Sequence, residues 1–546
     1  MPSKLNVGEY TSATGLPKET RSLCPECGKV IPARVFEKDG RVMMEKTCEE
    51  HGTVRDVYWS DVELYLRAEE WAVDGYGVTN PRYEAPPERC PFVCGLCSAH
   101  LSTTNLANLD LTNRCNLKCP VCFANANASG YVFEPSFEEV VRMLEVLREE
   151  RPVPTPAVQL AGGEPTIYPR FLDVVRKARE LGFAQIQVAT NGILLAHREG
   201  FAQEMVDSGM HTVYLQFDGL REEDYVAARG VPLLETKKKA IEACRGTSPR
   251  PLATIFVPTI IKTINDDQVG PILDYAIENR DVVRGVNYQP VAFTGRIDEE
   301  SRERERYTLS DLAHDLERQT GYIDRYDLYP VPSVTAISRL ITAIHEPKMA
   351  FTAHPHCGLA TFLVIDEKGR ATPITRMVDV EGLLRKMWKM AERAETTIGR
   401  LVVGIGKRFS RIKDEQERRE TLFRKFDEYF GEFIKVDDLP GGISLHDVLA
   451  EMTFTPEKDP LSKFTWSTMF VGGMHFQDSY NYDIERVMRC VIHYVVPDGR
   501  IIPFCAYNGG PTYRTEVEKK FSIPLEEWRR RNAGKEEYYQ GDGSPA

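Results

Sequence analysis

Leu111-Thr-Asn-Arg-Cys115-Asn-Leu-Lys-Cys119-Pro-Val-Cys122-Phe123 follows directly on an alternating apolar run at 106–111. Three thiolates at C-x3-C-x2-C spacing can hold three corners of a cubane iron–sulfur cluster, which leaves one iron open to a further ligand. A zinc site, or three buried thiols beside a turn, are the structural alternatives. The stretch therefore predicts an iron–sulfur centre at the end of a strand.

Downstream of this loop, short apolar runs alternate with amphipathic stretches as far as about residue 291. We predict strands at 106–112, 157–161, 185–190, 212–217, 253–259 and 285–290, with helices at 137–150, 169–181, 199–207 and 269–279 among them. Repeated β/α units of this kind form parallel sheets. The sequence predicts an α/β fold with a partial (β/α)6 barrel.

Functional sites of such sheets lie at the carboxyl ends of the strands. The loops that follow four predicted strands carry Cys115–Cys122, Gly162–Pro165, Thr190–Gly192 and Gln216–Gly219. All four loops are therefore expected at one edge of the sheet, which a chance cysteine cluster would not require.

A C-x3-C-x2-C loop after the first strand, with Gly-Gly-Glu-Pro after the second, resembles the radical S-adenosylmethionine (SAM) enzymes over residues 106–295. The resemblance implies a [4Fe–4S] cluster on Cys115, Cys119 and Cys122, whose open iron is chelated by the amino and carboxylate groups of SAM. An electron from the reduced cluster then cleaves SAM, and the 5′-deoxyadenosyl radical removes a hydrogen atom from the substrate. The cofactor carries this chemistry, while the protein binds, orients and excludes water.

The same resemblance implies SAM-binding residues beyond the cysteines. Glu164 is a natural anionic partner for the methionyl ammonium. The implied contacts to that amino group come from Gly162, Gly163, Glu164 and Pro165, and Asn191 and Asp218 are placed near the ribose or the carboxylate.

Residues 20–60 contain two further cysteine knuckles, Cys24-Pro-Glu-Cys27 and Cys48-Glu-Glu-His51. A hairpin-like stretch with Asp39-Gly40 at its turn separates them. Three sulfur donors and one histidine suit a structural zinc or a rubredoxin-like iron, with His51 as fourth ligand or with a site built from the cysteines alone.

Two other groups of cysteines complete the set of 13, apart from Cys244, which is expected to be an ordinary buried thiol. Cys90, Cys94 and Cys97 repeat the C-x3-C-x2-C spacing outside the β/α pattern, and we interpret them as an auxiliary cluster. The last three cysteines, Cys357, Cys490 and Cys505, are dispersed in the sequence. They are interpreted as ligands of a second auxiliary cluster or as three unrelated buried thiols. A further alternative is that Cys357 completes the ligand set of the Cys90 triad. Possible non-cysteine ligands are His354, His356 and His493.

Composition restricts the class of protein. The net charge of −12 argues against a general nucleic-acid-binding surface. No run approaches the roughly 18 apolar residues that span a bilayer, and the first residues lack an apolar signal core. We expect a cytoplasmic enzyme, with peripheral contact to the inner membrane face as an option.

That option rests on a basic amphipathic stretch within 382–433, where Trp and Met lie among the basic residues Arg385, Lys386, Lys389, Arg393, Arg400, Lys407, Arg408, Arg411 and Lys413. Such a stretch is typical of contact with an anionic membrane, and equally of a solvated helix packed on the barrel. The apolar, Met-containing segment 464–483 suits the wall of an apolar channel or an ordinary core.

The division of the chain follows from these features. We predict a rubredoxin- or zinc-ribbon-like metal domain (1–60), a connector with an auxiliary cluster (61–105), the partial barrel (106–295), a helical extension with Cys357 (296–380), a basic helical region (381–437) and a C-terminal auxiliary and substrate-lining region (438–546).

Most of the chain also resembles the archaeal tetraether lipid synthases and relatives labelled as pterin methyltransferases. The resemblance implies sp3–sp3 carbon–carbon coupling of two isoprenoid lipid chains, with a long-chain lipid as substrate and a ferredoxin-like electron donor. The alternative is a radical SAM methyltransferase of a pterin or other small aromatic. An iron–sulfur electron-transfer protein is the third reading, and it would leave Gly162–Pro165 without a ligand.

Overall fold

The computed structural model describes residues 10–344, 349–395, 415–439, 443–454, 464–510 and 513–533. An open sheet of parallel strands forms its centre. The six predicted barrel strands are confirmed as neighbours in the order β12-β10-β9-β8-β7-β5. They are β5 (Leu106–Thr112), β7 (Ala157–Gly162), β8 (Gln185–Thr190), β9 (Thr212–Gln216), β10 (Ala253–Val257) and β12 (Val283–Pro290), with the short β11 (Thr259–Ile260) beside β12.

The helices between these strands bury one apolar face each, as their sequence periodicity predicts. In α2, for example, Val140, Met143, Leu144 and Leu147 face the sheet, and Ser136 caps the first turn together with Glu139. The helices are α2 (Phe137–Glu149), α3 (Phe171–Glu180), α4 (Ile193–His197), α5 (Phe201–Ser208), α6 (Glu222–Arg229), α7 (Leu234–Arg245) and α8 (Val269–Glu278).

C-terminal strands extend the barrel sheet at both edges. β18 (Thr468–Met474) pairs in parallel with β12, and β19 (Ile492–Val495) pairs in parallel with β5. Beyond them lie β13 (Tyr329–Pro330), β14 (Gly358–Ile365) and β15 (Ala371–Pro373) on one side and β20 (Ile501–Pro503) on the other. Residues near 357, 490 and 505 are therefore brought to the flanks of the barrel.

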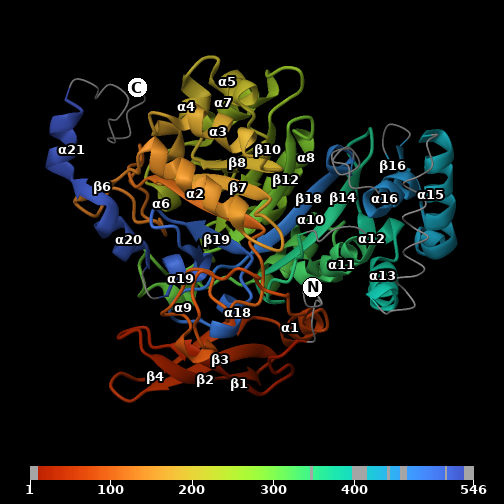
Figure 1. Cartoon of the computed structure of the whole chain (residues 1–546), viewed down its shortest axis with the longest axis horizontal. Helices are drawn as coiled ribbons and strands as arrows, with labels where there is room; N and C mark the ends of the chain where they lie inside the picture. Colours follow the sequence, from red (N-terminus) through yellow and green to blue (C-terminus); the bar gives the residue numbers. More distant parts are fainter. Residues whose placement is uncertain are drawn as a thin grey trace.

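The N-terminal strands form a separate antiparallel sheet, β1 (Lys18–Leu23), β2 (Val30–Lys38), β3 (Arg41–Cys48) and β4 (Gly52–Trp59). Asp39 and Gly40 make the predicted hairpin turn, both with positive φ (53° and 75°), as a two-residue turn requires. Figure 1 shows this sheet, in red, beneath the barrel and beside α18 (Ile484–Met488).

A buried ionic network fixes this sheet to the rest of the molecule. Arg306 donates to Asp56 of β4 at 2.6 Å and to Asp478 at 2.6 Å. The three side chains are 3%, 4% and 0% exposed. Both carboxylates depend on this one guanidinium for much of their counter-charge, although Arg302 also reaches Asp56.

The helical extension forms its own apolar cluster at one side of the molecule, where α13 (Val380–Glu395) packs against α11 (Thr335–Ile344) (Figure 1). Leu383, Leu384, Met387 and Ala391 are the buried residues of α13. The apolar face of the basic stretch is thus covered, so this part does not present it to a membrane. Arg400, Lys407, Arg408, Arg411 and Lys413 lie outside the described residues. Among the helices that are described, none combines the length and hydrophobicity that a membrane crossing needs.

The remaining elements connect these parts. They are α1 (Val62–Glu69), β6 (Tyr131–Phe133), α9 (Arg302–Glu305), α10 (Leu309–Thr320), α12 (Ile374–Met377), α15 (Glu415–Phe430), β16 (Asp438–Leu439), β17 (Ile443–Ser444), α16 (Leu445–Phe454), α19 (Phe504–Asn508), α20 (Tyr513–Phe521), β21 (Ser522–Pro524) and α21 (Leu525–Arg531). Both α9 and α10 lie within the segment 296–380, for which a helical extension was predicted.

Arg306→Ala is expected to destabilise the protein by about 3 kcal/mol, because it leaves two buried carboxylates short of their counter-charge. Denaturant unfolding under anaerobic conditions measures the loss. Arg318→Ala is the control: Arg318 is 68% exposed, and its pair with Asp315 is worth less than about 1 kcal/mol. Equal losses in the two variants would contradict the anchoring role of Arg306.

Candidate active site and metal centres

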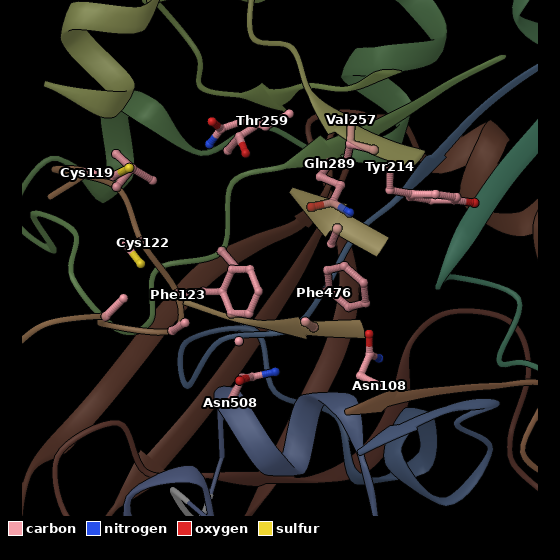
Figure 2. A pocket seen from close by; sticks show the side chains of 18 of the residues that line it. Asn108, Cys119, Cys122, Phe123, Tyr214, Val257, Thr259, Gln289, Phe476 and Asn508 are labelled. Atoms are coloured by element: carbon pink, nitrogen blue, oxygen red, sulfur yellow. The ribbon is translucent and has the colours of Figure 1, made fainter. Parts of the chain in front are cut away.

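Cys115, Cys119 and Cys122 line one cavity of about 310 Å³ at the carboxyl ends of the barrel strands. Gly162, Gly163, Glu164, Thr190 and Asn191 line the same cavity. Figure 2 shows Cys119 and Cys122 on one side of this space and Phe123 and Phe476 projecting into it. The structure thus brings the two sequence motifs together at the edge where they were expected.

The cysteine loop is held from two sides. The side-chain oxygen of Asn127 accepts from the Cys115 amide at 3.0 Å, and its amide nitrogen donates to the Cys115 carbonyl at 2.7 Å. Arg296 exchanges two backbone hydrogen bonds with Cys122, each 2.9 Å long, and its Nε donates to the Cys119 carbonyl at 2.7 Å. Hydrogen bonds from Asn127 and Arg296 therefore help to fix the conformation of the cysteine loop.

Two glycines allow the ends of β5 and β7 to approach closely. Gly162 has φ of 132°, and a Cβ on it would lie 2.3 Å from the Thr112 carbonyl oxygen. A Cβ on Gly163 would lie 2.2 Å from the Arg114 carbonyl oxygen. The Gly163 amide instead donates to the Thr112 carbonyl at 2.7 Å. Glycine is required at both positions because there is no room for a side chain.

Glu164 is fully buried and accepts four hydrogen bonds. They come from the Thr166 amide and hydroxyl (3.1 and 2.5 Å), the Thr190 hydroxyl (2.7 Å) and the Asn191 amide (2.9 Å). Burial raises its pKa, and these donors oppose the rise. The network fixes the orientation of the carboxylate at the cavity wall, where a ligand ammonium would compensate its charge.

Asn191 links the motifs. Its side-chain nitrogen donates to Asn116 of the cysteine loop at 2.6 Å, while its backbone amide donates to Glu164. A single residue after β8 thereby connects the cysteine loop to the Gly-Gly-Glu-Pro loop.

Asp218 lies behind the cavity wall instead of on it. Both of its carboxylate oxygens accept from Arg229, at 2.7 and 2.8 Å, and the side chains are 0% and 7% exposed. Arg229 is the residue that lines the cavity, and it also donates to the Val121 carbonyl at 3.1 Å. Asp218 thus positions the Arg229 cation, and its expected place near the ribose or the carboxylate of SAM stays a prediction. Pro165 starts a short helical turn and does not line the cavity.

Amide and aromatic side chains form the rest of the wall. Gln159 donates to Asn108 at 2.7 Å and accepts from Gln187 at 2.8 Å, so that neighbouring strands are joined by a row of amides. Phe476 and Phe504 stack with ring centroids 3.8 Å apart. Further amides in the lining are Gln216, Asn287, Gln289, Gln477 and Asn508.

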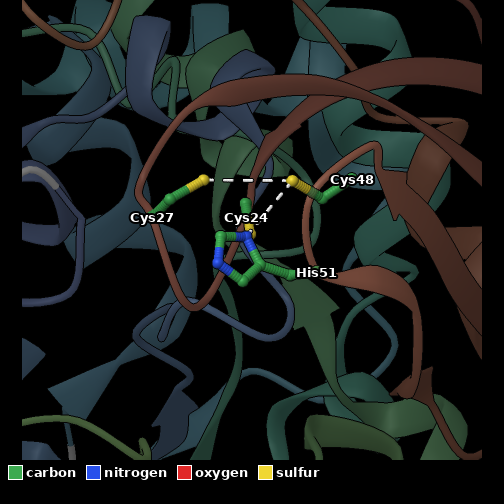
Figure 3. Close-up of side chains that lie close together, drawn as sticks. All are labelled: Cys24, Cys27, Cys48 and His51. Carbon is green, nitrogen blue, oxygen red and sulfur yellow. Dashed lines mark hydrogen bonds between the residues drawn. The ribbon is translucent and has the colours of Figure 1, made fainter.

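The N-terminal knuckles converge on one point (Figure 3). The sulfur atoms of Cys24, Cys27 and Cys48 and a ring nitrogen of His51 all lie within 4.8 Å of one another. His51 Nδ1 is 3.5 Å from Cys48 Sγ and 3.7 Å from Cys24 Sγ. Three sulfurs and one nitrogen fit a tetrahedral zinc or iron, and His51 is positioned as the fourth donor.

The auxiliary cysteines gather near the C-terminal strands. Burial raises the pKa of Cys94, and the charges of Cys90, Cys97 and Cys490 raise it further. Burial and then Cys505 and Cys357 likewise raise the pKa of Cys490. One short segment links two of the dispersed cysteines: the His475 amide donates to the Cys357 carbonyl at 3.0 Å, and the Gln477 amide donates to Cys505 Sγ at 3.4 Å.

The three histidines considered as ligands make local contacts. His356 stacks on Tyr65 at 3.8 Å between ring centroids, and its Nε2 donates to the Tyr65 carbonyl at 3.2 Å. His354 lies beside it. His493 Nε2 is 3.1 Å from His100 Nε2. These contacts agree with histidines that satisfy local hydrogen bonds.

Comparison with known proteins agrees with this geometry. The radical SAM superfamily matches residues 109–276, and the "HMPTM N-terminal zinc ribbon domain" matches residues 16–60. A relative from Methanocaldococcus jannaschii, named 7,8-dihydro-6-hydroxymethylpterin dimethyltransferase, is 44% identical over 94% of this chain and 97% of its own length. The chain belongs to the same radical SAM family as this relative.

More distant relatives match part of the chain. A probable GTP 3′,8-cyclase of Thermoplasma volcanium is 26% identical over 41% of this chain and 65% of its own length. Among solved structures, Streptococcus suis SuiB matches 41% of this chain and 47% of its own, with 21% identity and a TM-score of 0.33.

Sequence reasoning missed several residues of this radical SAM site. Arg229 ends α6 and carries no motif, and Lys237 on α7 is fully buried, where its ammonium donates to the Asn191 carbonyl and to Gln216. Burial lowers the pKa of Lys237 to about 8. The amides of the cavity wall occupy alternate positions of the strands, which point to one face of the sheet. This alternation of polar residues was the signal in the sequence that could have identified them as lining residues.

Replacing Cys24 and Cys48 together with Ser is expected to remove one metal ion per chain, because two of the four convergent donors are lost. Elemental analysis of the purified protein measures the total of zinc and iron. Cys244→Ser is the control, since Cys244 is a buried thiol on α7. A double variant with the full wild-type metal content would contradict the assignment.

Proposed function

We propose that this radical SAM enzyme is a methyltransferase of a pterin, acting on 7,8-dihydro-6-hydroxymethylpterin or a close analogue. The observation that carries the proposal is the row of amides in the cavity wall, together with the name of the relative that spans the chain. Each carboxamide has an NH₂ group that donates hydrogen bonds and an oxygen that accepts them. Such groups suit a heterocycle whose edge carries both donors and acceptors, as that of a pterin does.

The aromatic side of the cavity supports the same substrate. Phe476 and Phe504 are stacked, and the ring centroid of Phe123 lies 5.8 Å from that of Phe504. These rings offer flat apolar surfaces for a planar substrate. The cavity volume of about 310 Å³ lies at the lower end of the range for small-ligand sites, roughly 300–1,000 Å³. This volume includes the part of the cavity that the cysteine loop and Gly162–Glu164 line, so SAM and the substrate would share it.

The cofactors fit residues at the opposite side of the cavity. Cys115, Cys119 and Cys122 would hold the [4Fe–4S] cluster, which together with SAM supplies the adenosyl radical when both are bound. Glu164 would accept from the methionyl ammonium, with its orientation fixed by Thr166, Thr190 and Asn191. Arg229, held by Asp218, would present a cation to an anionic group such as a carboxylate.

Coupling of two isoprenoid chains is the second candidate, and the apolar part of the wall favours it. Its residues include Val257, Val291, Met474, Phe476 and Ile492, as the Met-containing segment at 464–483 predicted in part. This candidate requires room for two long chains beside SAM. Peripheral membrane contact belongs to this second candidate.

Both candidates need a one-electron donor of the ferredoxin class. The Cys90 loop is a candidate entry point, because Tyr83 and Phe92 beside it are 41% and 48% exposed. Auxiliary clusters on Cys90, Cys94 and Cys97 and on Cys357, Cys490 and Cys505 remain part of the proposal.

Cys119→Ala is expected to abolish formation of 5′-deoxyadenosine from SAM and dithionite, because the cluster loses one of three ligands. Anaerobic assay with product detection by liquid chromatography and mass spectrometry measures this. The matched control Cys244→Ala keeps the activity. Cleavage of SAM by Cys119→Ala would contradict the choice of catalytic triad.

The same assay separates the substrates. With the dihydropterin and excess SAM present, we expect 5′-deoxyadenosine to increase and methylated pterin to form, with a second SAM as the methyl donor and S-adenosylhomocysteine as its product. Coupled lipid from a diether substrate, with no change on addition of pterin, would overturn the methyltransferase proposal and favour the second candidate.

A further inference from the structure

Arg486 lies among the three dispersed cysteines. It is on α18 and is 2% exposed. Its Nε donates to Cys357 Sγ at 3.5 Å, and its Nη2 donates to the His475 carbonyl at 2.5 Å. Burial lowers the pKa of Arg486, but the charges of Cys357, Tyr58 and Cys505 raise it, and the net direction is upward.

Most other buried guanidinium groups among the described residues are paired with carboxylates, and Arg284, which donates to backbone carbonyls, is the exception. Arg489, one turn along from Arg486, contacts Asp74 at 2.5 Å and Glu485 at 2.8 Å. Arg486 differs: within the part of the chain that the structure describes, no carboxylate oxygen lies within 4.0 Å of its nitrogens. The nearby Asp483 instead accepts from Thr20 and Tyr58.

A buried cation without a compensating anion is strongly unfavourable. Cys357 Sγ, which accepts from Arg486 Nε at 3.5 Å, is the nearest candidate for that negative charge, and Cys505 Sγ accepts from the Gln477 amide, two residues after the His475 carbonyl that Arg486 also contacts. Neutral thiols do not supply it, whereas thiolates bound to an iron–sulfur group do. The buried arginine therefore fits a group that carries net negative charge at these cysteines.

A buried polar atom near this position also lacks a partner. Among the described residues, none forms a hydrogen bond with His475 Nε2. The Gln477 amide donates to Cys505 Sγ at 3.4 Å. Phe504, which precedes Cys505, and Ile492, two residues after Cys490, both line the substrate cavity. The three cysteines and Arg486 therefore form a site that a further bound group would complete. This site lies next to the wall of the substrate cavity.

We infer that Arg486 is the counter-cation of an iron–sulfur group bound by Cys357, Cys490 and Cys505, and that it raises the reduction potential of that group. A one-electron reduction adds a negative charge to the group, and a cation that contacts a ligand sulfur favours the reduced form. The inference rests on the proposed auxiliary cluster, and it does not depend on which substrate the enzyme uses.

The test is a redox titration of the full-length, anaerobically reconstituted enzyme, followed by electron paramagnetic resonance. Loss of one signal and of its iron in Cys505→Ala identifies the group. Arg486→Gln is expected to lower the midpoint potential of that signal by about 60 mV, which is a tenfold shift of the one-electron equilibrium. Arg486→Lys, which keeps the charge but not the guanidinium geometry, is expected to lie between Gln and wild type.

Arg284 provides the matched control. It is buried, binds the carbonyls of Thr465 and Thr468, and burial lowers its pKa to about 10. Arg284→Gln is expected to leave the potential unchanged.

An unchanged potential in Arg486→Gln, or Cys505→Ala with full iron content, would overturn the inference. If Arg486→Gln does not fold, Arg486→Met, which also removes the charge, takes its place, and an unchanged potential in that variant would overturn the inference. Failure of the pterin assay leaves this titration unaffected, so the two proposals can fail separately.

Discussion

The close approach of two strand ends is the constraint on which the active site depends. At Gly162 and Gly163 the end of β7 passes so near the carbonyls of Thr112 and Arg114 that neither position has room for a Cβ. This contact sets the cysteine loop, which follows β5, against the Gly-Gly-Glu-Pro loop, which follows β7. Glu164 and Asn191 then lock the arrangement by hydrogen bonds that join both loops to the end of β8.

Paired charges organise the rest of the polar interior. Asp218 orients Arg229 at the cavity, Arg306 joins the zinc-ribbon sheet to the C-terminal segment, and Arg514 contacts Asp110 on β5 at 2.6 Å. Each pair offsets part of the desolvation penalty that its members would have alone. The positions of the metal centres relative to the cavity are thus determined by electrostatics as well as by the apolar core.

Much of the fold could be predicted because parallel strands and amphipathic helices leave regular patterns in the sequence. All six barrel strands and the Asp39-Gly40 turn occur where those patterns indicate. The site was predictable where residues are close in sequence, as at Cys115–Cys122 and Gly162–Glu164.

Contacts between distant segments carry no comparable signal. Asp218 was expected near SAM, and the bidentate arginine from α6 that it orients was not predicted. The neighbourhood of Cys357, Cys490 and Cys505 depends on β14 and β19, which join the sheet at opposite sides of the barrel strands. The basic stretch was read from composition alone, and in α13 its apolar face is used for packing.

The most direct test of the central claim is whether SAM binds the cluster held by Cys115, Cys119 and Cys122. Electron–nuclear double resonance of the reduced enzyme with SAM labelled by ¹⁵N at its amino group measures this contact. We predict a hyperfine coupling between that nitrogen and the cluster. Absence of the coupling in enzyme saturated with SAM would contradict the account.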